Sequence, residues 1–161
     1  MAAIGVDTGD LRALVKRLRG DGSKQLIKDL RDALKAAAEP AADDAERRVQ
    51  AMRRTGRTHA TPSLVGRVAT KVKVQVRTGT GRSTGVNVVA PLGGYPRGFD
   101  MAPRRLNRVG GWRHPVFGRN VWVTQVGAPG WFDDAIRAAG PGAEQRVQQV
   151  LTDLAERLSR G

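Results

Sequence analysis

The large rings of this chain are concentrated in one short segment. All three tryptophans and two of the three phenylalanines lie between residues 111 and 132 of a 161-residue chain that has a single tyrosine. Because aromatic side chains bury more surface than other types, we expect this segment to organise the fold or a partner surface. Its rings are Trp112, Phe117, Trp122, Trp131 and Phe132.

Length and composition restrict the class of protein. We expect residues 1–161 to form a single domain with one core. The chain has no cysteine, so it has no disulfides and no thiolate chemistry, which suits an intracellular protein. Charged residues interrupt the first twelve positions before any apolar run forms, so we expect no signal peptide. No apolar run approaches the roughly 20 residues that span a bilayer, so we expect no membrane partner.

The charge is unevenly spread along the chain. The net charge is +13, yet residues 47–132 hold 16 basic residues and one acidic residue, while the two ends together hold 12 basic and 14 acidic ones. A basic block of this kind indicates an anionic partner, either nucleic acid or an acidic protein face. In the alternative interpretation, the arginines only solubilise exposed strands and loops.

Helices are predicted at residues 8–53. Apolar residues recur at helical spacing between positions 11 and 18, and a second apolar stripe runs from Leu26 to Met52. Ser23 is placed to cap this second helix. Pro40 lies inside the stripe and cannot donate to the helical ladder, so either a kink or the start of a new helix is expected there.

Strands are predicted between residues 64 and 126. Valines from Val68 to Val76 alternate with polar residues, and a second valine-rich run at 86–89 is expected to pair with them in antiparallel fashion through a hairpin loop at 78–83. A third strand is expected at Val121–Val123. Between the second and third strands, residues 91–111 predict a long loop rich in Gly, Pro and Arg, of a kind that is usually functional or mobile.

Helices at 131–159 are expected to complete the chain. Asp133 and Asp134 favour a helix N-terminus, Gly-Pro-Gly at 140–142 should interrupt it, and an amphipathic helix should follow. The predicted class is therefore α+β, with helices at both ends packed on a small, mostly antiparallel sheet.

The sequence contains few residues in arrangements that could support catalysis. The two histidines, His59 and His114, have no nearby His, Cys or carboxylate partners that could complete a zinc site. No serine lies in a nucleophile-elbow sequence, and Gly79-Thr80-Gly81 lacks the Gly-Lys-Ser/Thr ending of a phosphate-binding loop. We expect no enzyme activity, no cofactor and no metal.

The residue order around the rings is distinctive. It reads Gly-Trp-Arg-His-Pro-Val-Phe-Gly at 111–118, a strand-like Trp-Val-Thr-Gln at 122–125, and Pro-Gly-Trp-Phe opening a helix at 129–132. This order resembles the tail-completion proteins, a family of tail components found at the head–tail neck of long-tailed bacteriophages. The resemblance is sharp over residues 111–135, and elsewhere it covers only the order of helices, strands and a C-terminal helix.

The resemblance implies a structural virion protein of the head–tail junction. Such a subunit forms a homo-oligomeric ring, with a hexamer among the implied stoichiometries, which links connector proteins to the tail. The implied partners are other neck and tail proteins and the DNA that passes through the ring. The implied location is the tail or neck of the virion, after assembly in the host cytoplasm.

Two groups of residues are candidates for subunit contacts. A cyclic ring needs two different patches on each subunit, and the basic block could face acidic residues of a neighbour. The candidate electrostatic contacts are Arg47, Arg48, Arg53, Arg54, Lys71 and Lys73. The other candidate interface residues are Trp112, His114, Phe117, Trp122, Trp131, Phe132, Arg104, Arg105 and Arg108.

Both groups also have simpler interpretations. The simplest interpretation of the aromatic residues is that they belong to the core. His114, which precedes Pro115, is either a pH-sensitive contact or a locally hydrogen-bonded residue in extended backbone. The basic block equally allows sequence-independent nucleic-acid binding. Against that alternative, residues 47–82 contain no aromatic ring to stack on bases.

Overall fold

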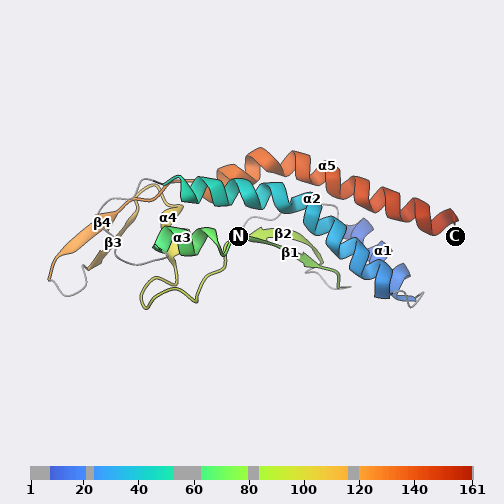
Figure 1. Ribbon diagram of the computed structural model, residues 1–161, viewed down its shortest axis with the longest axis horizontal. Coiled ribbons are helices and arrows are strands. Elements are labelled where there is room, and N and C mark those ends of the chain that lie inside the picture. The colour runs from blue at the N-terminus through green and yellow to red at the C-terminus, as the bar shows by residue number, and fades with distance from the viewer. Residues whose placement is uncertain (1–7, 21–23, 53–62, 80–83, 116–119, 161) are drawn as a thin grey trace. The chain divides into compact units, whose positions relative to one another are not determined.

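A computed structural model describes residues 8–20, 24–52, 63–79, 84–115 and 120–160, which form five helices and four strands (Figure 1). The predicted α+β class is confirmed. The chain divides into two compact units. The first unit comprises residues 1–42, 73–89 and 136–161, and the second comprises residues 43–72 and 90–135. The length of the chain predicts a single domain, and this stays a prediction.

The first unit draws on three helices. They are α1 (Thr8–Gly20), α2 (Lys24–Gln50), which belongs to this unit as far as residue 42, and α5 (Trp131–Arg160), which belongs to it from residue 136. Each helix buries the apolar stripe that its spacing predicts, since amphipathic helices are held chiefly by packing of that face. Fully buried members are Leu11, Val15, Leu18, Leu34, Ala38, Ala41, Ala143 and Val147. Ser23, the predicted cap of α2, lies outside the described residues.

Neither helical proline ends its helix. Pro40 lies within α2, and no new helix begins there. The interruption predicted at 140–142 is wrong, because α5 runs through Pro141 as one helix. The apolar stripe continues from Ile136 to Val147 on both sides of the proline, so packing of that face outweighs the lost hydrogen bond.

The first unit also contains an antiparallel hairpin. Strand β1 (Lys73–Arg77) pairs with β2 (Gly85–Val89), in the register that places Lys73 opposite Val89. This confirms the antiparallel pairing, whereas most of the predicted loop, residues 80–83, lies outside the described residues. At the end of β1, buried Thr78 accepts hydrogen bonds from Arg19 and Arg31, 3.1 Å and 3.0 Å away, so two cations of α1 and α2 hold the hairpin.

In the second unit, two short helices lie in segments that were predicted to be strand and loop. Helix α3 (Leu64–Ala69) occupies the expected start of the strand region, because Ser63 caps it through Gly66 N at 3.2 Å and its apolar residues fit helical spacing as well as alternation. Helix α4 (Ala102–Leu106) lies inside the expected loop 91–111, with Pro103 in its first turn.

A second hairpin completes this unit. Strand β3 (Trp112–Pro115) pairs antiparallel with β4 (Trp122–Gln125), so the third strand was predicted in the right place. The strands form two separate two-stranded ladders instead of the one small sheet expected. The difference arises because each strand finds its partner across its own hairpin, which satisfies its backbone locally.

Candidate functional site

The second unit carries an unusual exposed apolar surface. Every large hydrophobic side chain exposed in the described part of the chain lies between residues 92 and 126. Four of them follow one another on or beside β4, and we name them the apolar strip: Val121, Trp122, Val123 and Val126. Four exposed apolar side chains within residues 121–126 are typical of an interaction site, since isolated exposed residues are ordinary but groups of them are not.

The register of the β3–β4 hairpin places an arginine beside the exposed tryptophan. Arg113 pairs with Thr124, and Trp122 lies two positions from Thr124 on β4, so Trp122 shares the face of Arg113. The Arg113 guanidinium lies 5.6 Å from the centroid of the Trp122 ring. Trp122 is 54% exposed, so this cation–π pair presents an apolar ring and a charge together at the surface.

The other face of the hairpin is packed. Trp112 is buried, and the His114 ring lies 5.7 Å from it and 5.9 Å from Phe99, measured between ring centroids. The His114 Nε2 is 3.2 Å from Gln125 Oε1. These contacts favour the local structural interpretation of His114. At the start of β3, Gly111 has a φ of +61°, and a Cβ there would lie 2.1 Å from the Gln125 carbonyl oxygen, so the hairpin closes only with glycine.

Trp131 and Phe132 belong to the interior. They are 2% and 6% exposed, and their rings pack edge-to-face at 5.3 Å. Of the aromatic interface candidates in the described residues, only Trp122 is therefore exposed. Phe117 lies outside the described residues.

Asn107 holds the start of α5 and was missed by sequence reasoning. Its Oδ1 accepts from Phe132 N at 3.1 Å, its Nδ2 donates to Asp133 Oδ2 at 2.7 Å, and its carbonyl accepts from Gly130 N at 3.0 Å. An asparagine 24 positions before the first residue of a helix carries no capping signal in the sequence, because the usual cap is the adjoining residue. This clamp fixes the chain that connects β4 to α5.

Three arginines were predicted to lie at an interface in the 91–111 segment. Arg104 and Arg108 are exposed, and no hydrogen bond or ion pair joins either side chain to another described residue. Arg105 is half-buried, and its guanidinium lies 3.4 Å from the Gly98 carbonyl oxygen. Two of the three are therefore available to an anionic partner.

The predicted electrostatic contacts divide into several kinds. Arg48 Nε and Arg47 pair with the two Asp44 oxygens, at 2.7 Å and 3.1 Å, within α2. The hydrogen bond from Arg48 lowers the pKa of Asp44 below its usual value, against an opposing effect of burial, with Arg47 adding to the lowering. Lys73 is exposed on β1. Arg53 and Arg54 lie outside the described residues.

Lys71 has an internal role instead. Its ammonium donates to the carbonyls of Gly93 and Gly94, at 3.1 Å and 2.6 Å, and lies 4.4 Å from the centroid of the Tyr95 ring. Tyr95 in turn donates to the Pro91 carbonyl at 3.2 Å, and burial raises its pKa. This cluster orders the start of the 91–111 segment.

No group of three or more His, Asp or Glu side chains gathers at a spacing that could hold a metal ion within the described ranges. None of the described helices is both long and apolar enough to cross a membrane. The chain matches none of the protein-family models, curated proteins or solved structures with which it was compared.

Proposed function

We propose that this protein is a structural subunit of the head–tail junction of a long-tailed bacteriophage, which forms a ring between connector proteins and the tail. The observation that carries the proposal is the apolar strip along β4, with Arg113 beside the exposed Trp122 ring on the face of the hairpin opposite to His114. An exposed indole beside an arginine is the composition of an interface anchor, because Trp and Arg dominate binding energy at protein contacts.

The residue order that resembles tail-completion proteins includes the β3–β4 hairpin and the start of α5. The same segment supplies the exposed strip, so the resemblance and the surface chemistry point to one place. In this proposal the protein acts in the virion after assembly in the host cytoplasm, and its partners are copies of itself and neighbouring neck and tail proteins.

The test is the absolute mass of the purified protein in solution, measured by light scattering at low and high salt. We expect a discrete multiple of the 17.3 kDa chain, which shrinks at high salt if charged contacts such as that of Arg113 contribute. A monomer at every salt and protein concentration would contradict the ring.

The alternative is sequence-independent nucleic-acid binding. Exposed Arg104, Arg108 and Arg113 on the second unit favour it, since phosphates are held by such side chains without any base contact. A titration with double-stranded DNA at physiological salt distinguishes the two functions. Submicromolar affinity from a monomeric protein would replace the structural proposal, whereas a discrete oligomer without DNA affinity would support it.

A further inference from the structure

Two arginines of the first unit converge on one residue at the end of β1. Arg19, in the last turn of α1, donates through Nη2 to the Thr78 carbonyl at 3.1 Å. Arg31 of α2 donates through Nη2 to the Thr78 hydroxyl oxygen at 3.0 Å. Thr78 is buried, whereas Arg19 and Arg31, which we name the arginine pair, are exposed. One buried threonine therefore holds cations from two helices at a single place on the surface.

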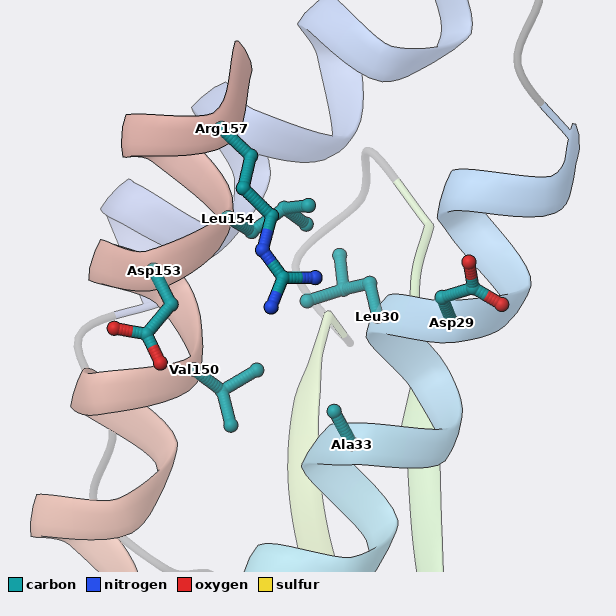
Figure 2. Close-up of a pocket in the computed structure, with 7 residues that line it drawn as sticks. All are labelled: Asp29, Leu30, Ala33, Val150, Asp153, Leu154 and Arg157. Carbon is teal, nitrogen blue, oxygen red and sulfur yellow. The ribbon is translucent and has the colours of Figure 1, made fainter. Parts of the chain in front are cut away.

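No carboxylate of the described residues neutralises the arginine pair, since neither guanidinium forms an ion pair with any of them. The acids beside Arg31 on α2 have other partners. Asp32 pairs with Lys28 at 3.0 Å, and Asp29 accepts a hydrogen bond from Gln25 at 2.7 Å. Figure 2 shows the Asp29 carboxylate on the side of α2 that faces away from α5. Two like charges are thus held together without a counter-charge, an arrangement that an anion would stabilise.

The chemistry of the arginine pair suits a phosphate group. A guanidinium carries several N–H donors, and each of these two uses a single donor on Thr78. A carboxylate has two oxygens and fits one guanidinium as a bidentate acceptor. A phosphate group has more acceptor oxygens and a larger charge, so it can accept from two guanidiniums that approach from different helices.

We propose that the arginine pair binds a phosphate group, either of free inorganic phosphate or of a nucleic-acid backbone. Thr78 is a positioning residue, because its two oxygens fix the guanidiniums before the anion arrives and so reduce the ordering that binding requires. This site goes beyond the proposed function. It lies in the first unit, whereas the apolar strip lies in the second.

Phosphate titration of the unmodified chain and of two charge-matched variants tests the site. Isothermal calorimetry at constant ionic strength measures the affinity for inorganic phosphate. We expect saturable binding that is at least about tenfold weaker in the Arg19→Gln/Arg31→Gln variant, because charge-assisted hydrogen bonds are lost. The control variant Arg17→Gln/Lys24→Gln removes two exposed cations from the same two helices and should keep the affinity. Equal losses in both variants, or no saturable binding by the unmodified chain, would overturn the proposal.

A substitution that changes no charge separates a built site from general attraction by a chain of net charge +13. Thr78→Val removes the hydroxyl oxygen that holds Arg31 and leaves the carbonyl that holds Arg19. Phosphate affinity should fall at least about threefold, the loss of one weak hydrogen bond. An unchanged affinity would show that net charge alone attracts the anion. Circular dichroism checks that each variant is folded, and Arg19→Lys/Arg31→Lys, which keeps both charges, replaces the glutamine variant if that chain unfolds.

A duplex DNA titration identifies the source of the phosphate. If the Arg19→Gln/Arg31→Gln variant loses affinity for the duplex as well as for inorganic phosphate, the site holds a nucleic-acid backbone. If only the affinity for inorganic phosphate falls, the ligand is a free phosphate. The outcomes are independent of the ring, since a monomer that binds phosphate through the arginine pair would contradict the proposed function and leave this site in place.

Discussion

Lys71 and Lys73 lie two positions apart in a segment where valines alternate with polar residues, and nothing in the sequence distinguishes the two lysines. The structure separates them, since the Lys71 ammonium binds two backbone carbonyls and the Tyr95 ring while Lys73 is exposed on β1. The difference comes from Gly93 and Gly94, more than twenty positions later, which bring their carbonyls to one cation. A charge in a basic block can therefore be a structural residue.

We predict that Lys71→Met lowers the free energy of unfolding by about 1–3 kcal/mol, because two charge-assisted hydrogen bonds and a cation–π contact are lost together. Urea denaturation followed by circular dichroism measures the change. The matched control Lys73→Met should stay within about 0.5 kcal/mol of the unmodified chain. Equal effects of the two substitutions would show that the Lys71 cluster does not order its segment.

At the scale of elements, the two long helices show how packing overrides a local signal. Pro40 and Pro141 each remove a backbone donor, yet α2 and α5 continue through them. Near Pro40, the Arg146 Nε donates to the Ala37 carbonyl at 3.1 Å, so a side chain of α5 binds the backbone of α2 next to the Ala36 carbonyl, which is the one that the proline leaves without its helical donor. Pro141 is exposed on α5.

We predict that Pro141→Ala raises the free energy of unfolding by about 1–3 kcal/mol, because alanine restores the helical hydrogen bond without the ring clash. Pro40→Ala should give a comparable gain, since Pro40 likewise removes one helical hydrogen bond and Arg146 binds the Ala37 carbonyl, not the Ala36 carbonyl that loses its donor. Thermal and urea unfolding of the two variants in parallel give the comparison. A loss of stability in Pro141→Ala would mean that the packing of α5 requires the proline geometry.

At the scale of the whole molecule, the distribution of charge between the two units differs from its distribution along the sequence. The sequence suggests a basic middle between near-neutral ends, but the first unit holds 15 basic and 9 acidic residues, net +6, and the second 13 and 6, net +7. The units are similarly basic because the first one includes residues 73–89 from the middle of the chain. Surfaces of opposite charge must therefore arise locally within each unit.

A net charge of +13 predicts weak DNA binding at low salt whatever the function. If Arg104, Arg108 and Arg113 make three phosphate contacts, affinity should fall about 40-fold between 50 and 200 mM salt. Fluorescence anisotropy with two unrelated duplexes measures this. The triple substitution of these arginines by glutamate should remove the binding, and affinity that survives both salt and substitution would favour dedicated nucleic-acid recognition.

The sequence determined the parts of this protein that depend on local periodicity. The α+β class, the buried helical stripes, the first antiparallel hairpin and the segment that holds the aromatic rings follow from residue spacing, because neighbours at a fixed interval share a face, whereas strand β3 and its pairing with β4 were not predicted. Short segments are harder to predict. The apolar residues of α3 fit both helical spacing and strand alternation, and the capping hydrogen bond of Ser63 favours the helix.

Only the tertiary structure decided which of these residues are available to a partner. The sequence offers five similar rings, and packing buries Trp112, Trp131 and Phe132 while it leaves Trp122 beside Arg113 at the surface. The Asn107 clamp and the Arg146–Ala37 hydrogen bond between α5 and α2 join residues 25 and 109 positions apart. Such contacts depend on how whole elements meet, and local spacing carries no information about that.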